Sequence, residues 1–267
     1  MKLLLAMLLP FIVAFADSLE QIRSKGVVRI GVYDGQPPFS ELNDGTFEGF
    51  EVTMAQAIAN DLFGEKGGRI ELVPMKVEDR IPALVNNRVD IVIATITITP
   101  ERAQQIDFST PYFSVNLGVL TRKADRIKSL ADLREKRILR ESGGTGEAFF
   151  KQEGFGNFTF CKIARECYRM LKDGDVDAYA TDNLIAMAYP VVDSEVEVPL
   201  KTLGKPDFMG IGVQKGNKEL LDFVNAELIK LSKEGFFEKA YEGTFNPFYH
   251  GAADKRYFLL DGIYSFL

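Results

Sequence analysis

The sequence has no tryptophan, only two cysteines and a single histidine among its 267 residues. Two cysteines can form neither a disulfide-dense scaffold nor a four-cysteine zinc site. An excess of positive charge is also lacking, because 32 Lys and Arg are outnumbered by 38 Asp and Glu and leave a net charge of −6. Such a chain has no basic surplus with which to hold nucleic acid or an anionic membrane. We therefore expect a protein that binds a small molecule, without nucleic acid, metal or cofactor.

The hydrophobic content and the length of the chain are typical of a globular protein with a packed core. Hydrophobic residues make up 46% of the chain, which is too many for intrinsic disorder. Domains usually contain ~100–200 residues, so the length allows one large domain or two modest ones.

The first sixteen residues have the pattern of a secretory signal peptide. Lys2 precedes an apolar run that ends in Ala14-Phe15-Ala16. A charged start, a short apolar core and an ending in small residues are typical of an export signal that is cleaved. The run is shorter than the ~20 apolar residues of a membrane span. We expect cleavage after Ala16, and no lipid anchor, because Asp17 rather than a cysteine follows.

The rest of the chain alternates short β-branched runs with amphipathic stretches. The pattern predicts strands at 27–32, 69–75 and 89–97, and helices at 50–64 and 219–235. This alternation predicts an α/β protein with mainly parallel sheets.

Two segments resemble crossings between lobes: the polar stretch after residue 120 and the extended stretch near 205–213. They divide the mature chain into lobe one, residues 17–114 plus 209–267, and lobe two, residues 115–208. Pockets favour domain interfaces and the carboxyl ends of strands. We therefore expect a ligand cleft between the two lobes.

The most informative stretch is residues 94–102, ATITITPER. Its apolar strand brings Thr95 and Thr97 to the point where Pro100 can open a short helix, and Arg102 follows. The planar guanidinium of Arg102 suits a carboxylate through two parallel hydrogen bonds. Spacing alone leaves the alternative of a β-rich strand followed by a solvated surface arginine.

Two further stretches supply complementary groups. Residues 141–147, ESGGTGE, form a glycine-rich turn before a helix, where backbone N–H groups of Gly144 and Thr145 can face an anion. Asp182 ends the apolar run VDAYATD at a helix start. It is either a helix N-cap or an anion that faces a bound ammonium group.

Together these stretches resemble the periplasmic amino-acid-binding proteins of bacterial polar amino-acid ABC importers. The resemblance spans the mature chain and rests on its motifs in the family's order: GFEVTMAQAIA at 49–59, RIPAL at 80–84, ATITITPER and DFSTPYF within 94–113, GGTG and VDAYATD. It implies a periplasmic protein with the two-lobed type II fold, in which two hinge strands join α/β lobes that close on the ligand. It also implies a monomer that docks transiently on an inner-membrane ABC permease.

The resemblance assigns roles to single residues. Arg102 would bind the α-carboxylate, shared by Thr97 and Thr145, and Asp182 would bind the α-ammonium group. Thr95 and Gly144 would line the same walls, and Tyr33 and Phe39 would pack on the carbon chain of the ligand. Leaving either charged end unpaired in a dry slot would cost several kcal/mol.

The side chain of the ligand is less constrained. Arg80 matches an arginine that meets the side-chain carboxylate in the acidic-amino-acid binders of this family, although a surface arginine is the alternative. Tyr33 stands where those binders often carry Lys or Arg. Asp34, Glu41 and Glu141 could instead favour a cationic ligand. We expect aspartate or glutamate first, another polar amino acid second and a cationic one third.

An enzyme on the same scaffold, similar to cyclohexadienyl dehydratase, is the alternative class. Its catalytic glutamate follows the Thr-Asp pair, where this chain has Asn183-Leu184-Ile185, so we expect no enzyme. Cys161 and Cys167 lie six positions apart, and an oxidising compartment would allow a disulfide between them. The spacing leaves that pairing open.

Overall fold

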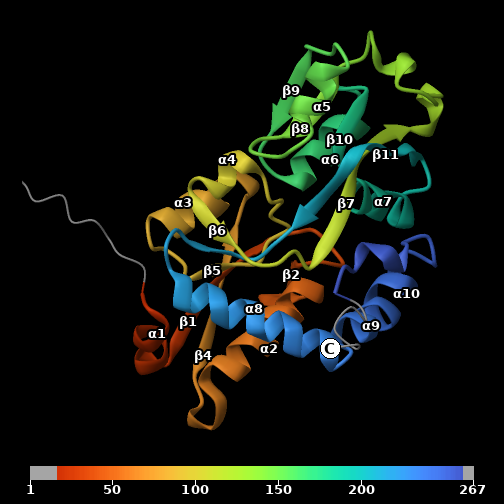
Figure 1. Ribbon diagram of the computed structural model, residues 1–267. Coiled ribbons are helices and arrows are strands. Elements are labelled where there is room, and N and C mark those ends of the chain that lie inside the picture. Colours follow the sequence, from red (N-terminus) through yellow and green to blue (C-terminus); the bar gives the residue numbers. More distant parts are fainter. Residues whose placement is uncertain (1–16, 261–267) are drawn as a thin grey trace, which may run out of the picture.

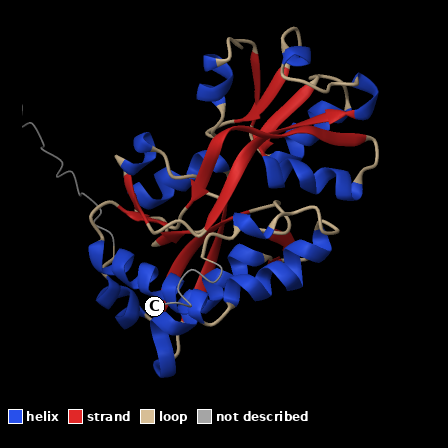
Figure 2. Cartoon of the chain, turned by 45° about the vertical axis from the view of Figure 1, so that its right-hand side comes forward, coloured by secondary structure: helices blue, strands red, loops and turns tan. Residues whose placement is uncertain are grey.

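The computed structural model describes residues 17–260, so the predicted signal peptide at 1–16 lies outside the described residues. The chain forms two lobes, each built on a five-stranded sheet with helices packed against it (Figure 1). Two long strands pass from one lobe to the other (Figure 2). The predicted α/β, two-lobed fold is confirmed.

The first lobe contains the sheet β4-β1-β5-β12-β6. Its strands are β1 (Val27–Tyr33), β4 (Arg69–Met75), β5 (Ile91–Val92), β6 (Ile106–Phe108) and β12 (Gly212–Gln214), and a hairpin of β2 (Glu41–Asn43) and β3 (Thr46–Glu48) precedes its second helix. Its helices are α1 (Leu19–Lys25), α2 (Phe50–Phe63), α3 (Arg80–Val85), α4 (Pro100–Ala103), α8 (Lys218–Lys233), α9 (Phe236–Ala240) and α10 (Asn246–Phe248).

The second lobe contains the sheet β11-β7-β10-β8-β9. Its strands are β7 (Phe113–Arg122), β8 (Ile138–Glu141), β9 (Phe158–Cys161), β10 (Ala178–Asp182) and β11 (Val196–Met209). Its helices are α5 (Glu147–Gln152), α6 (Ala164–Lys172) and α7 (Asn183–Val192).

Both sheets are mixed, so the expectation of mainly parallel sheets is wrong. The pairs of β1 with β4 and β5, and of β8 with β9 and β10, are parallel. The pairs made by β7 and by β12 are antiparallel. Strands that enter a sheet as the chain crosses between lobes run against the strands of the local βαβ units, which makes the sheets mixed.

The crossing strands β7 and β11 pair along their length, from Phe113 opposite Met209 to Arg122 opposite Val196. Phe113 and Met209 are buried in the core of the first lobe, whereas Val196 is buried in a core of the second. Each strand therefore has one end anchored in each lobe, which is the arrangement of a two-stranded hinge.

Local signals set most element boundaries closely. The predicted helix at 50–64 is α2, which ends at Phe63 before Gly64. The predicted strand at 89–97 is wrong beyond Val92, because only Ile91–Val92 is strand. The chain leaves the sheet there, and Thr95 takes a φ of 47°, a left-handed conformation that a β-branched residue seldom adopts.

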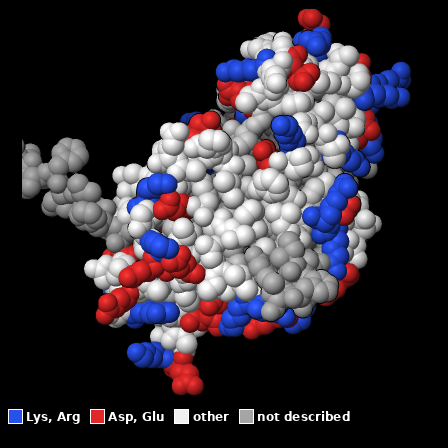
Figure 3. Space-filling model, viewed as in Figure 1, with Lys and Arg blue, Asp and Glu red and all other residues white. Residues whose placement is uncertain are grey.

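The surface carries no block of one charge on the face that Figure 3 shows, where Lys and Arg are interspersed with Asp and Glu. Within residues 17–260, no helix has the length and apolar character that crossing a membrane requires.

Candidate functional site

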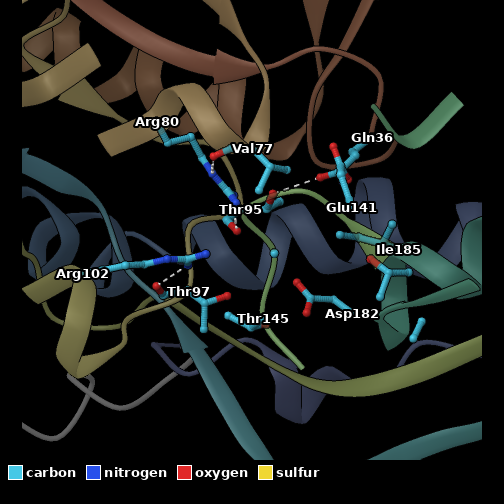
Figure 4. Close-up of a pocket in the computed structure, with 13 residues that line it drawn as sticks. Gln36, Val77, Arg80, Thr95, Thr97, Arg102, Glu141, Thr145, Asp182 and Ile185 are labelled. Atoms are coloured by element: carbon cyan, nitrogen blue, oxygen red, sulfur yellow. Dashed lines mark hydrogen bonds between the residues drawn. The ribbon is translucent and has the colours of Figure 1, made fainter. Parts of the chain in front are cut away.

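A small cavity of about 30 Å³ lies between the two lobes. Its walls are formed by side chains of both lobes, which point toward one another (Figure 4). Every predicted ligand-binding residue except Tyr33 and Phe39 lines it: Arg80, Thr95, Thr97, Arg102, Gly144, Thr145 and Asp182. Gln36, Val77, Glu141, Ala180, Thr181 and Ile185 complete the lining.

Arg102 stands at the end of the short helix α4. The Thr99 side chain accepts a hydrogen bond from the Arg102 backbone N–H, and Pro100 occupies the first turn, so the local sequence defines the helix start. The guanidinium donates to the Thr97 carbonyl at 2.7 Å and to the Gly143 carbonyl of the other lobe at 2.7 Å. Burial and then the charge of Arg80 lower the pKa of Arg102 to about 10, so it stays cationic at neutral pH.

Arg80 is a buried arginine, not the surface residue that was its alternative. It is 4% exposed, and its Nε donates to the Val77 carbonyl. Its Nη1 donates to the carbonyls of Ala94 at 2.7 Å and Thr95 at 2.8 Å. Burial lowers its pKa, and the charge of Glu141 opposes that shift. Backbone carbonyls therefore fix this cation in the wall before any ligand arrives.

The left-handed backbone at Thr95 is held by hydrogen bonds to residues that were not predicted to take part in the site. Glu51, on α2, accepts a hydrogen bond from the Thr95 N–H at 2.8 Å, and the same oxygen accepts one from the Tyr112 hydroxyl. The Thr95 hydroxyl donates to Gln36 at 2.9 Å. Burial raises the pKa of Glu51 to about 7. Glu51 lies in the motif at 49–59, but 44 positions separate it from Thr95, so its contact with the pocket wall does not follow from the local sequence.

The glycine-rich turn of the second lobe is held from outside the pocket. Arg140, on β8, donates to the carbonyls of Gly144 at 3.2 Å and Thr145 at 2.6 Å, and to Glu147 at 2.9 Å. Gly146 has a φ of 91°, which favours glycine at the end of this turn. Arg140 is a second supporting residue that the sequence analysis missed.

Asp182 is the last residue of β10 and the N-cap of α7, but its side chain makes no capping hydrogen bond. The backbone of Asp182 pairs with Leu117 on β7, but its side chain forms no hydrogen bond or ion pair with any residue of the described range. Burial and then the charge of Asp207 raise the pKa of Asp182 to about 7, against the pull of Arg80 and Arg102. A half-buried carboxylate without a partner is unfavourable, so the two oxygens of Asp182 can accept a cationic group that enters the cavity.

Tyr33 and Phe39 do not line the cavity. The Tyr33 hydroxyl donates to Glu141 at 2.6 Å and accepts from the Ala164 N–H at 3.2 Å, so it joins the lobes at the edge of the site. Phe39 is fully buried in the first lobe, edge-on to Phe113 and Phe245 with ring centroids 5.2 and 5.1 Å away. The apolar core, not the cleft, takes this ring.

Glu141 faces the cavity from the end of β8. Burial raises its pKa to about 7, and the hydrogen bond from Tyr33 and the charge of Arg80 oppose that shift. The cavity therefore holds two arginines and two carboxyl groups. Ile185 lines the wall just after Asp182 and supplies no proton-transfer group.

Cys161 and Cys167 form a disulfide, with their Cα atoms 5.4 Å apart, that ties the end of β9 to α6. Within residues 17–260, no cluster of three His, Cys, Asp or Glu side chains could hold a metal ion.

Comparison with known proteins gives concordant matches. The family model described as bacterial extracellular solute-binding proteins, family 3, matches residues 28–247. The chain is 32% identical over 240 residues to the ABC transporter glutamine-binding protein GlnH of Bacillus subtilis, covering 85% of this chain and 84% of that one. It is 30% identical over 239 residues to the L-cystine-binding protein TcyJ of Escherichia coli, covering 87% and 88%.

Among solved structures, the solute receptor for L-cysteine of Neisseria gonorrhoeae superposes with a TM-score of 0.84 at 34% identity. The match covers 89% of this chain and 97% of that one.

Proposed function

The chain belongs to the bacterial extracellular solute-binding proteins, family 3, and on that premise we propose that it captures a small, electrically neutral, polar L-amino acid between its lobes. Members of this group bind amino acids for ABC importers, and this protein is such a binding component rather than an enzyme. The identity of the ligand is the part that the proposal adds.

The observation that carries the proposal is the balance of charge in the cavity. When both carboxyl groups are ionised, the positive charges of Arg80 and Arg102 there equal the negative charges of Asp182 and Glu141. A zwitterionic amino acid with a neutral side chain preserves this balance, because its carboxylate meets Arg102 and its ammonium group meets Asp182. Each end then replaces water with a charge-assisted hydrogen bond.

The size of the cavity supports a short side chain. The space of about 30 Å³ is only two to three times the ~10–15 Å³ that a cavity needs to hold one water molecule, so even a small amino acid requires the walls to part slightly. The similarity to a receptor for L-cysteine makes L-cysteine the first ligand to test.

Aspartate or glutamate is the second candidate. The described hydrogen bonds of Arg80 use Nε and Nη1, which leaves Nη2 available to a side-chain carboxylate. Such a ligand adds a negative charge beside Glu141, so its binding would require a proton on that residue. A cationic amino acid is the third candidate, because it would use the charge of Glu141.

The proposal includes a mechanism and a place of action. The amino acid enters the open protein at the Arg102 wall, and residues 115–208 close over it as lobe two against 17–114 plus 209–267. Ligand favours the closed form only through its better contacts there. The closed monomer would deliver its ligand in the periplasm to an inner-membrane ABC permease, after export and cleavage following Ala16.

A thermal-shift screen tests the ligand. The protein from Asp17 onward is unfolded and refolded to remove carried ligand, then heated with L-cysteine, L-serine, L-glutamine, L-aspartate, L-glutamate or L-arginine. A ligand at 100 times its Kd adds about 2.7 kcal/mol of stability. We expect the largest shift with L-cysteine or another small neutral amino acid. A shift with only aspartate and glutamate, or only arginine, would refute this choice of ligand.

A further inference from the structure

The C-terminal segment, residues 246–260, reaches α7 of the second lobe from the core of the first. The family model ends at residue 247, so most of this segment lies beyond the matched region. Tyr249, Tyr257 and Phe258 are buried in the first-lobe core, and Phe258 forms a β-bridge with Phe113 at the start of the hinge strand β7. Figure 1 shows α10 beside α7.

Two tyrosine hydroxyls of this segment bind the residues that directly follow Asp182. Tyr257 accepts a hydrogen bond from the Asn183 side-chain amide at 2.8 Å. Tyr249 donates to the Leu184 carbonyl at 2.8 Å. Both hydrogen bonds are buried, so removing one partner would leave a buried polar group unsatisfied, which costs free energy.

Asn183 links Tyr257 to the turn that carries Asp182 through its side-chain hydrogen bonds. Its Oδ1 accepts from the N–H of Asn116 on β7 at 3.2 Å and from the N–H of Leu184 at 2.9 Å. Gly118 allows the close approach, since a Cβ there would lie 2.8 Å from the Asn183 Cα. The amide side chain thus bonds the hinge strand, the helix start and Tyr257 at once.

Asp182 has no side-chain partner of its own within the described residues, so its direction depends on this turn. We propose that Tyr249 and Tyr257 are positioning residues for Asp182, and that the segment beyond the family domain thereby sets the ammonium subsite. The proposal rests on the proposed function, in which Asp182 binds the ammonium group of an amino acid.

The test uses Tyr→Phe variants, which remove single hydroxyls and keep the buried rings. Tyr249→Phe and Tyr257→Phe are combined in one protein. Tyr241→Phe is the matched control, because its hydroxyl donates to the Ala253 carbonyl at 3.2 Å and its bond stays within the C-terminal region. Affinity for L-cysteine is measured by calorimetry in each variant, with Asp182 intact and in the Asp182→Asn background.

We expect the double Tyr→Phe variant to bind about tenfold more weakly than the parent when Asp182 is intact. A tenfold loss corresponds to about 1.4 kcal/mol, the scale of one or two buried hydrogen bonds. In the Asp182→Asn background the same change should cost less than twofold, and Tyr241→Phe should cost less than twofold in both. Equal losses in the two backgrounds, or no loss in either, would overturn the positioning role.

A readout without ligand separates this proposal from the proposed function. In the unliganded double variant, we expect faster amide hydrogen exchange at Asn183 and Leu184 and a shifted carboxyl titration of Asp182 by NMR. Tyr241→Phe should change neither. Failure of L-cysteine to bind the parent protein would count against the choice of ligand. Unchanged exchange and titration in the double variant would refute the role of the tyrosines.

Discussion

The two walls of the pocket are prepared to different degrees. In the first lobe, backbone carbonyls of Val77, Ala94 and Thr95 hold the Arg80 guanidinium, and the Thr97 carbonyl holds that of Arg102. The second lobe instead presents Asp182, a carboxyl group without a hydrogen-bond partner in the described part of the chain.

This difference suggests an order of binding. A wall whose cations are already fixed loses little conformational entropy when it receives a carboxylate. The second wall gains more from the ligand, because an ammonium group would relieve a carboxylate whose burial raises its pKa to about 7. On the proposed function, the first lobe would capture the ligand, and the second lobe would then close because the ammonium group of the ligand pairs with Asp182.

Removing the cation of the first wall should have the largest effect. Arg102→Ala should weaken binding of L-cysteine on the order of a hundredfold or more, since it leaves the ligand carboxylate buried without its partner. Calorimetry measures the loss, and circular dichroism checks the fold. Arg102→Lys should recover only part of the affinity, because an ammonium group cannot make two parallel bonds. Affinity within threefold of the parent for Arg102→Ala would refute the site.

The acidic wall should give a smaller loss with a pH signature. Binding of an ammonium group requires ionised Asp182, so binding releases its proton wherever the free protein holds one. With a pKa of about 7 in the free protein, affinity should rise about tenfold from pH 6 to pH 8. Asp182→Asn should weaken binding about thirtyfold at pH 8 and abolish this rise.

Glu51 provides the control for this comparison. Burial raises the pKa of Glu51 to about 7 as well, but its partners are Thr95 and Tyr112 rather than ligand. Glu51→Gln should therefore retain the pH dependence of affinity. If the affinity of Asp182→Asn still rises from pH 6 to pH 8, the pH dependence belongs to a group other than Asp182.

The same raised pKa values contribute to the pH dependence of stability in the unliganded protein. Because folded Glu51, Glu141 and Asp182 hold protons more tightly than the unfolded chain, their contribution to stability is fully present below pH ~4 and declines as pH rises through about 7. Melting temperatures across this range measure the effect. Asp182→Asn should flatten the decline.

The first wall was also easier to predict from the sequence than the groups that support it. Arg102 follows a threonine-rich strand and a helix-opening proline, so its place depends on a few neighbouring residues. Glu51 and Arg140 support the site through contacts that local pattern does not encode. Phe39 was predicted to contact the ligand but is buried in the core, because the local sequence of its loop is compatible with either position of the ring. Contacts with Phe113 and Phe245, far along the chain, decide between them.

The smallest effect should come from removing the Tyr33 hydroxyl, which contacts the second lobe at the edge of the pocket. Tyr33→Phe removes the hydroxyl that donates to Glu141 and accepts from the Ala164 N–H, so only the closed form loses these bonds. Affinity for L-cysteine should fall about fivefold, or ~1 kcal/mol, the net value of one hydrogen bond. Tyr168→Phe is the control, because its hydroxyl bonds Asp193 within the second lobe. Equal losses in the two variants would mean that Tyr33 supports the fold rather than closure, and the hydrogen bond from Arg102 to the Gly143 carbonyl would then be the better candidate for a bond that stabilises the closed form.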